Sequence, residues 1–433
     1  MKTFPLAAVV TLLVSLASLA QDLPQRAEGL IDRTEQRVID WRRHIHANPE
    51  LSYQETQTAA YIAEQLRAMP GIEVRTGLAK TGVKAVLRGA QPGPVIALRA
   101  DMDALPVEEK SGLPFASRVK TQWRGKESFV AHACGHDTHV AMLLGAAHVL
   151  SQLRGELAGT VVFLFQPAEE WGGADGTPSG ATLMVRDGAL VDPKVDAVLG
   201  QHIGPEIPQR SLQYRRGSIM ASGDDFTITV RGKGSHGAYP WEGKDPIIVA
   251  AEIALALQTI VSREANLVED GPLVVTIGII QGGNRENIIP ETAELTGTIR
   301  TLSEKSRKMA QESLRLKATK IAEASGLTAD VKLVIGYPVL SNKAALVDRV
   351  LPALERAAGG AGRVIEIPPI LAAEDFGAYG QGGIPTFYWF LAASPFPDRR
   401  GPPNHSPQFT IDEGALRIGT RALVGATLRY LEK

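Results

Sequence analysis

The chain is poor in cysteine and carries almost no net charge. Cys134 is the only cysteine among 433 residues, which excludes an internal disulfide. The 46 basic and 47 acidic residues leave a formal net charge of -1, so the basic excess of a protein that binds nucleic acid or an anionic membrane is missing. Hydrophobic content of 44% and charged content of 21% are typical of a folded globular protein. We therefore expect a small molecule as the substrate or ligand, and no nucleic acid.

Long hydrophobic runs are also missing, except at the N-terminus. There an apolar run from Phe4 to Leu19 follows Met1-Lys2 and ends in the small-residue site Ser18-Leu19-Ala20. This pattern predicts a signal peptide over residues 1–20, cleaved near Ala20, and a secreted or periplasmic mature protein. A membrane anchor is the alternative, although about 16 apolar residues are short for a span. No later stretch approaches ~18 uninterrupted apolar residues, so no membrane association is expected after cleavage.

Length and hydrophobic periodicity predict two domains, one inserted in the other. Buried-strand patterns alternate with helical patterns over residues 21–214 and again over 336–433, which predicts an α/β domain with a central, mostly parallel sheet. Between them, residues 215–335 follow the order strand, helix, strand, strand, helix, strand, the βαββαβ order of a ferredoxin-like domain. The first helix of this inserted domain is expected to be amphipathic and to span Pro246 to Arg263.

The segment from Ala131 to His139, AHACGHDTH, holds the densest group of metal-binding residue types. A thiolate at Cys134 and an imidazole at His136 suit a borderline or soft divalent metal ion. A helical pattern follows, so both side chains are expected where a loop enters a helix, and the residues that precede the segment are expected to form a loop. Three further polar residues of the segment are assigned supporting roles: His132, Asp137 and His139. For His139, the plainer interpretation is a position in the core.

Further candidate residues lie near the ends of predicted strands. Asp103 follows one buried strand, Glu169 and Glu170 follow the strand GTVVFLF, and His202 follows a third. Because ligands bind at the carboxyl ends of strands in open α/β sheets, we expect these residues beside the cluster. The two adjacent glutamates point to opposite sides of the chain, so one can ligate a metal ion while the other faces a water molecule. Taken singly, the plainer interpretations are a helix start for the glutamates, a core position for His202 and an exposed loop for His405.

Five segments of the chain together carry a family resemblance: Trp41 to Ser52 (WRRHIHANPELS), Arg99 to Pro106 (RADMDALP), His132 to Asp137 (HACGHD), Gln166 to Glu170 (QPAEE) and Asn404 to Pro407 (NHSP). They resemble the aminoacylase and glutamate-carboxypeptidase family of di-metal metallopeptidases. Within it they are most similar to the amidohydrolase branch of hippurate hydrolases, N-acyl-amino-acid amidohydrolases and indole-3-acetyl-amino-acid hydrolases. The segments occur in the family's order, and the match extends over essentially all of the mature chain.

The resemblance implies two divalent metal ions per subunit, with zinc, manganese, cobalt or nickel as candidates. The position of Cys134 bridges the two ions in the family, and four residues complete the coordination: His136, Glu170, His202 and His405. Glu169 matches the general base, which takes a proton from the metal-held water as it attacks the amide carbon. Asp103 matches the carboxylate that orients the ligands. Other branches have histidine at the position of Asp101 and an aspartate as the bridge, so the role of Asp101 stays open.

The inserted domain resembles the family's lid, which also forms the dimer, so a homodimer or higher homo-oligomer through the lid is expected. His236, in the sequence GSHGA, matches a lid histidine that reaches a partner subunit's active site and polarises the scissile carbonyl. Asn287 and Arg300 are candidates to bind the carboxylate of the substrate, which a guanidinium group holds with two hydrogen bonds. The plainer interpretations are a turn histidine among glycines and, for Arg300, a solvated charge at a strand end.

These residues predict a metal-dependent amidohydrolase that cleaves the amide bond of N-acyl or N-aroyl amino acids, or of similar small conjugates. Two alternatives stay open: a metallo-carboxypeptidase or dipeptidase on the same site, and a catalytically silent protein that binds a small molecule. The second alternative needs the metal ligands but has no use for Glu169. Glu374-Asp375-Phe376 also looks like a family feature, with only packing or supporting roles assigned.

Overall fold

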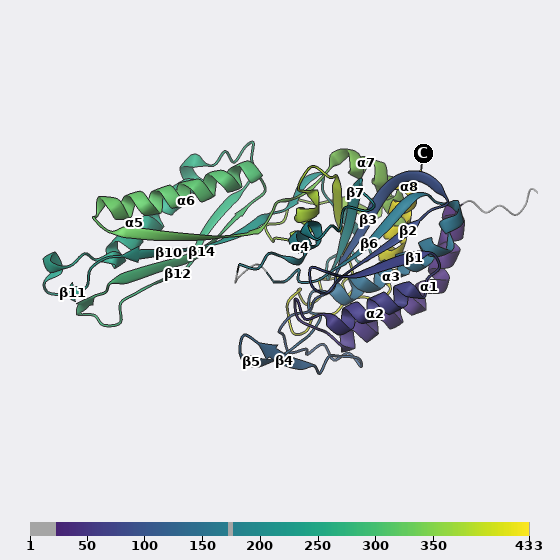
Figure 1. Ribbon diagram of the computed structural model, residues 1–433, viewed down its shortest axis with the longest axis horizontal. Helices are drawn as coiled ribbons and strands as arrows, with labels where there is room; N and C mark the ends of the chain where they lie inside the picture. Colours follow the sequence, from purple (N-terminus) through teal and green to yellow (C-terminus); the bar gives the residue numbers. More distant parts are fainter. Residues whose placement is uncertain (1–22, 172–175, 433) are drawn as a thin grey trace, which may run out of the picture.

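The structure, a computed structural model, describes residues 23–171 and 176–432. The predicted signal peptide lies outside these residues. Figure 1 shows two domains, one built on a large sheet flanked by helices and a second, elongated domain that extends away from it. The elongated domain is formed by the middle of the chain, so the α/β domain consists of two separate parts of the sequence. The predicted α/β fold with an inserted βαββαβ domain is confirmed.

An eight-stranded sheet forms the centre of the α/β domain. Its strands are β1 (Ile72–Leu78), β2 (Gly82–Arg88), β3 (Gln91–Asp101), β6 (Ala158–Gln166), β7 (Ala197–Gly204), β8 (Leu212–Tyr214), β17 (Val364–Glu366) and β18 (Thr386–Ala392). Across the sheet they lie in the order β1-β2-β6-β3-β7-β18-β8-β17. The four central strands β6, β3, β7 and β18 are parallel, and the pairs β1–β2, β2–β6 and β8–β18 are antiparallel. The ends of β3, β6 and β7 therefore meet at one edge of the sheet.

Helical segments pack on both faces of this sheet (Figure 1). One face shares a hydrophobic core with α1 (Leu23–Ala47), α2 (Thr56–Arg67), α3 (His136–Gln152), α7 (Ala344–Ala358) and α8 (Ala415–Leu431). The other face packs against α4 (Gly180–Arg186) and the 3-10 segment Asp375–Gly380. Shorter helical turns occur at Arg154–Glu156, Pro240–Glu242 and Ala361–Arg363. Strand β6 is almost continuously buried, because it is covered on both faces.

The residues before the metal-binding segment are not all loop, contrary to the sequence prediction. They include a hairpin of two short strands, β4 (Lys120–Trp123) and β5 (Lys126–Phe129). Trp123 of this hairpin packs edge to face on Trp171, and Trp171 packs in the same way on Tyr53. The hairpin is short and largely polar, so its hydrophobic pattern is too weak to predict it from the sequence.

The inserted domain, called the lid below, has a four-stranded antiparallel sheet with two helices on it (Figure 1). The elements in chain order are β10 (Ser222–Arg231), α5 (Pro246–Thr259), β12 (Leu273–Gly282), β14 (Thr292–Thr301), α6 (Glu304–Ala324) and β15 (Thr328–Tyr337). The strands lie in the order β12-β14-β10-β15, which leaves β12 and β15 at the edges. Two further short strands, β11 (Ser235–His236) and β13 (Ile288–Ile289), pair with each other beyond the end of this sheet.

Helix α5 is apolar on both its faces, so the expectation of an amphipathic helix is wrong. Val249, Ile253 and Leu257 pack in the core of the lid, whereas Ile248 and Leu255 are exposed on the outward face. With the π-helical turn Ile260–Glu264 that follows it, this helix is long and apolar enough to cross a membrane by length and composition. Its inward residues instead cover the sheet of the lid.

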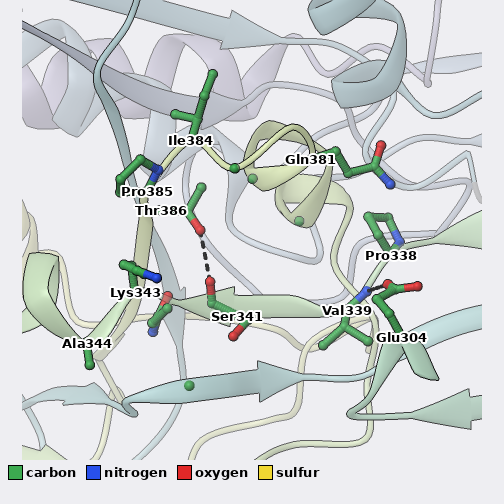
Figure 2. Close-up of a pocket in the computed structure, with 15 residues that line it drawn as sticks. Glu304, Pro338, Val339, Ser341, Lys343, Ala344, Gln381, Ile384, Pro385 and Thr386 are labelled. Atoms are coloured by element: carbon green, nitrogen blue, oxygen red, sulfur yellow. Dashed lines mark hydrogen bonds between the residues drawn. The ribbon is translucent and has the colours of Figure 1, made fainter. Parts of the chain in front are cut away.

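The two connections between the domains lie side by side. Strand β9 (Gly217–Met220) leads into the lid and β16 (Leu340–Asn342) leads out of it, and the two strands pair antiparallel with Leu340 opposite Met220. We call this pair of strands the hinge. A cavity of about 560 Å³ opens beside it, and Figure 2 shows the residues that line the cavity. Glu304 of α6 accepts a hydrogen bond of 2.7 Å from the backbone N–H of Val339 there. The described residues that line this cavity include none of the predicted site residues, so it is separate from the metal-binding cluster.

Candidate metal centre

The structure brings six predicted residues together at the edge where β3, β6 and β7 end. Their ligand atoms form three groups, and within each group the atoms lie within 4.8 Å of one another. The groups share members, so they make one continuous cluster. Its members are Cys134, His136 and His202 in the first group, Cys134, Glu170 and His405 in the second, and His136, Glu169 and Glu170 in the third.

Local backbone geometry places the side chains of the cluster. Gly135, between Cys134 and His136, has a φ of +91°, and a Cβ atom at this position would lie 2.5 Å from the Cγ2 atom of Ile203. Only glycine fits this turn, which directs the thiol and the imidazole to the same side as α3 begins. His202 lies within β7, whereas the sequence prediction places it beyond the end of that strand.

The C-terminal loop is tied directly to the cysteine loop. The backbone N–H of His405 donates to the carbonyl oxygen of Ala133 at 2.7 Å. The side-chain amide of Asn404 donates to the carbonyl oxygen of Cys134 at 3.1 Å and lies 3.6 Å from its Sγ atom. These bonds hold His405 against the cluster although it comes from a distant part of the chain.

Hydrogen bonds to the Nδ1 atoms of His136 and His202 leave the Nε2 atom of each ring directed at the cluster, where it can ligate a metal ion. The Nδ1 atom of His136 lies 2.9 Å from the carbonyl oxygen and 3.2 Å from the Oδ1 atom of Asp103. Its Nε2 atom is buried without a hydrogen-bond partner among the described residues. The Nδ1 atom of His202 lies 2.6 Å from the carbonyl oxygen of Ile203, and its Nε2 atom faces the Sγ atom of Cys134 at 3.4 Å. Because carbonyl and carboxylate oxygens only accept, Nδ1 carries the proton and Nε2 presents its lone pair to the cluster.

The charges of the cluster also fit a bound cation. Hydrogen bonds to Cys134 and then to Glu170 raise the pKa of His405 to about 10. Burial alone lowers the pKa of His136, but the charges of Asp101 and Cys134 outweigh it and raise this pKa well above its ordinary value. Both histidines thus attract protons because the site holds excess negative charge. Divalent cations satisfy the same charge, and the sulfur, nitrogen and oxygen donors present suit them.

Asp103 holds the strand end that carries the two glutamates. Its Oδ1 and Oδ2 atoms accept the backbone N–H groups of Glu169 and Glu170 at 3.1 and 3.0 Å. The Ser52 hydroxyl donates to Oδ2 at 2.6 Å. Burial raises the pKa of Asp103, but the hydrogen bonds from His136 and Ser52 outweigh it and lower the pKa overall. The carboxylate is therefore ionised and orients both His136 and the glutamate turn.

Asp101 lies between a buried arginine and two histidines. The guanidinium of Arg99 contacts Asp101 at 2.6 Å, and the Nδ1 atom of His139 lies 2.5 Å from the Oδ1 atom of Asp101. The Nε2 atom of His139 accepts the backbone N–H of Ile203 at 2.8 Å. His139 thus links Asp101 to the strand that carries His202, which is a supporting role.

Glu169 lies among other carboxylates in a buried site. Its carboxyl oxygen lies within 4.8 Å of those of Glu374 and Asp375. Burial raises the pKa of Glu169 well above its ordinary value, and the charges of Glu374, Glu170 and Asp375 raise it further. A high pKa makes the carboxylate a strong proton acceptor, and cations bound beside it would lower this pKa again.

The predicted lid residues lie outside this cluster within one subunit. His236 is exposed on β11, which Figure 1 shows at the end of the lid remote from the α/β domain. Asn287 is beside it, since its carbonyl oxygen accepts the backbone N–H of Gly237 at 2.8 Å. Arg300 lies at the hinge end of β14, opposite Gly223. The ten residues of β14 separate the two ends by roughly 30 Å, so one lid does not bring Arg300 and Asn287 together.

Three residues that support the site are missing from the sequence prediction. Arg99 contacts Glu374 and Asp375 at 3.0 and 2.8 Å and keeps that buried acidic group partly neutralised. The hydroxyl of Tyr337, the last residue of the lid sheet, donates to the carbonyl oxygen of Glu169. Glu55 accepts the backbone N–H of Ala168 at 2.8 Å. Each acts through a contact between segments that are far apart in sequence, and the sequence carries no signal of such contacts.

The chain is similar to known proteins over nearly its whole length. The profile of peptidase family M20/M25/M40 matches residues 97–429. Thermostable carboxypeptidase 2 of Saccharolobus solfataricus is 40% identical over 95% of this chain and 100% of its own length. N-acetyl-L-cysteine deacetylase of Bacillus subtilis is 40% identical over 92% of this chain and 89% of its own length.

A solved structure agrees with these relatives. The crystal structure of a dinuclear metal binding peptidase of the M20 family from Bacillus subtilis superposes with a TM-score of 0.74. It is 34% identical, over 92% of this chain and 98% of its own. The family resemblance of the five segments is confirmed. The chain belongs to peptidase family M20/M25/M40, and it is a hydrolase of amide bonds that uses two divalent metal ions.

Proposed function

We propose that the protein cleaves the amide bond of N-acyl amino acids, releasing an amine that carries a free carboxylate. The observation that carries this proposal is the cluster of Cys134, His136, Glu170, His202 and His405, with Glu169 beside it. The deacetylase relative, whose name gives an N-acetyl amino acid as its substrate, supports this substrate class.

The residues of the cluster have distinct roles in this proposal. Two divalent ions held by the five ligands would lower the pKa of a water molecule and polarise the amide carbonyl. Glu169 accepts the proton of the attacking water and returns it to the leaving nitrogen. Asp103 keeps the proton of His136 on Nδ1 and fixes the turn that carries Glu169. His236 of a partner subunit donates to the developing oxyanion.

The ligand atoms of the cluster limit which metal ions can bind, but they fit more than one ion. One thiolate, three imidazoles and one carboxylate suit zinc, manganese, cobalt or nickel. We propose zinc or manganese, and elemental analysis of the purified protein decides between them.

A substrate panel tests the proposed reaction. N-acetyl and N-benzoyl derivatives of several amino acids are incubated with the metal-loaded protein, and the released amine is measured. Hydrolysis of at least one derivative is expected. Failure to hydrolyse any member of a broad panel, with metal restored, contradicts the proposal.

A carboxypeptidase is the second candidate function, because the carboxypeptidase relative is equally similar to the chain. Both reactions release an amino acid with a free carboxylate from an amide bond, and they differ in the group on the acyl side. Dipeptides and N-blocked dipeptides belong in the same panel. A kcat/KM higher for blocked dipeptides than for N-acetyl amino acids favours the carboxypeptidase.

A second copy of the chain is the proposed partner of the lid. Exposed apolar side chains gather on α5 and on the edge strand β12, which lie next to each other: Ile247, Ile248, Leu255, Ile279 and Ile280. An open sheet edge beside an apolar helix face suits pairing with the same surface of another subunit. This arrangement would also carry His236 away from its own subunit's cluster and toward another one.

Replacing Ile280 by lysine is expected to convert the dimer into monomers, because it places a charge on the apolar edge. Light scattering after size-exclusion chromatography measures the mass. Activity should fall with it by about 100-fold, the effect of losing one oxyanion donor. Leu316→Lys, a matched change at an exposed leucine of α6, should leave the dimer intact. A dimer that survives Ile280→Lys shows that the subunits associate elsewhere.

Mixed dimers test whether His236 acts in the partner subunit. His236→Ala and Glu169→Gln chains are co-expressed with different tags, and the heterodimer is isolated on both tags. One of its two sites combines an intact Glu169 with the partner's His236, so about half of the native activity is expected. Each parent homodimer should be nearly inactive. A heterodimer as inactive as its parents contradicts action across the interface.

Export of the protein is proposed on the N-terminal sequence alone. Residues 1–20 have the charged start, apolar run and small-residue site of a cleaved signal peptide. N-terminal sequencing of the protein from a fractionated culture tests this. A mature chain that begins near Gln21 in the secreted or periplasmic fraction is expected, and an intact Met1 in the cytoplasm contradicts it.

A further inference from the structure

The turn that carries Glu169 includes a residue with a strained backbone conformation. Ala168, the residue before Glu169, has a φ of +51°, in the left-handed region that residues with a Cβ atom rarely adopt. Its side chain is fully buried. A residue holds such a conformation only where its surroundings impose it, and such positions concentrate at functional sites.

Two buried carboxyl groups accept hydrogen bonds from three successive backbone N–H groups of this turn. The N–H of Ala168 donates to the Oε1 atom of Glu55 at 2.8 Å. The N–H groups of Glu169 and Glu170 donate to the two oxygens of Asp103 at 3.1 and 3.0 Å. Glu55 is therefore the only one of these two acids that acts on the strained residue itself.

The position of Glu55 is itself fixed. It is fully buried at the start of α2, and its Oε2 atom accepts the hydroxyl of Thr81 at 2.7 Å. Burial, and then the charge of Asp103, raise the pKa of Glu55 to about 8, so the neutral acid predominates at pH 7. Glutamine at this position keeps the same charge and the same acceptor for Ala168.

The turn is confined from the opposite side by α4. The N–H of Gly180, the first residue of α4, donates to the carbonyl oxygen of Ala168 at 3.1 Å. A Cβ atom at Gly180 would lie 1.6 Å from the carbonyl oxygen of Pro167. The turn thus lies between α4 on one side and Glu55, at the start of α2, on the other. If the side chain of Glu55 is replaced, the backbone of the turn can move only toward α2.

We propose that Glu55 is a positioning residue for catalysis: it holds Ala168 in the left-handed conformation and so aims the side chains of Glu169 and Glu170. This inference rests on the proposed role of Glu169 as the general base. Glu55 does not contact the substrate and acts through the backbone of the turn. Loss of its carboxyl group would rotate both glutamates away from the cluster.

Kinetics of Glu55 variants test the proposal, on whichever N-acyl amino acid is hydrolysed fastest. Glu55→Leu should lower kcat by about 100-fold with little change in KM, because a small misplacement of a catalytic group has an effect of this size. Glu55→Gln should keep kcat within about threefold of the native value. Glu50→Leu is the matched control, since Glu50 accepts the backbone N–H of Thr58 at 2.8 Å and does not touch the turn. It should lower Tm without lowering kcat.

A second substitution separates positioning from general destabilisation. Glycine adopts left-handed conformations without the strain of a Cβ atom, so Ala168→Gly should recover about tenfold of the activity lost in Glu55→Leu. The same substitution in the native background should have little effect. If Glu55→Leu causes the same loss whether or not Ala168→Gly is also present, Glu55 does not act through this residue.

The kcat values of the Glu55→Leu and Glu169→Gln variants distinguish a failure of the positioning role from a failure of the proposed base. A kcat for metal-loaded Glu55→Leu equal to the native value overturns the positioning role, while an active Glu169→Gln variant overturns the role of the base instead. If Glu55→Leu does not fold, Thr81→Val carries the test, because it frees the far oxygen of Glu55. It should lower kcat by about fivefold with KM unchanged, and an unchanged kcat overturns the proposal.

Discussion

Glu169→Gln is expected to lower kcat by about 1000-fold while two metal ions stay bound. Glutamine fills the same volume as glutamate but cannot accept a proton. Glu169 belongs to the cluster but is not one of the five proposed metal ligands, so its replacement should leave the metal ions bound. Burial and the nearby charges of Glu374 and Asp375 raise the pKa of Glu169, so its carboxylate readily takes up a proton. The glutamine side chain has no group that does so. Steady-state kinetics and elemental analysis of the same preparation measure both effects.

The control for this variant is an exposed glutamate of the lid. Glu312→Gln removes a charge from the outer face of α6 and should leave kcat and the metal content unchanged. A Glu169→Gln variant that keeps more than about a tenth of the native kcat contradicts the assignment of the base. A variant that loses its metal ions shows that Glu169 is a ligand instead.

Removal of the metal ions is expected to abolish hydrolysis, leaving less than about 1% of the native rate. The excess negative charge that raises the pKa of His405 to about 10 is then compensated only by protons. The apo-protein should therefore also have a lower Tm than the metal-loaded protein, because ions that bind only the folded state stabilise it. Rates before and after dialysis against a chelator, and after addition of zinc or manganese, measure the effect.

The Cys134→Ser variant tests metal dependence by changing a single ligand atom, from sulfur to oxygen. Serine keeps the shape of the side chain but its hydroxyl is not ionised at neutral pH, so the proposed bridge between the two ions is lost. We expect the variant to bind fewer than two ions per chain and to be inactive. His44→Ala, at an exposed histidine stacked on Tyr61 away from the cluster, should keep both ions. Full activity of the chelated protein, or of Cys134→Ser, contradicts a metal-dependent reaction at this cluster.

The parts of the fold and site that the sequence predicts are those with local signals. The apolar run of β6 and the alternating strands of the lid are patterns within ten residues, and they predict the two folds. The candidate ligands occupy short motifs near strand ends, and parallel strands bring these ends to one edge. Cys134, His136 and Glu170 are thus predictable together because the topology of the sheet brings them together.

What the sequence does not predict depends on contacts between distant segments. Nothing near Glu55 indicates that its carboxyl group meets Ala168, 113 residues further along the chain. The sequence predicts a polar outward face for α5, because a helix on a sheet needs only one apolar face. Its exposed Leu255 lies on the surface for which we propose a second copy of the chain as partner. A pattern with a helical period carries no information about contacts with distant segments or with another chain.

The pairing of β9 with β16 has a consequence for how the protein can be taken apart. Because Met220 and Leu340 are opposite each other in an antiparallel pair, the whole lid is topologically the loop of one hairpin. A two-residue turn suffices to join such strands, so the lid can be excised without stretching the α/β domain. The same geometry explains how a domain with its own hydrophobic core can be accommodated there, since the strands on either side need not move apart. The lid is in this sense a removable module, joined to the α/β domain by the β9–β16 pair and to the turn of Glu169 by the hydroxyl of Tyr337.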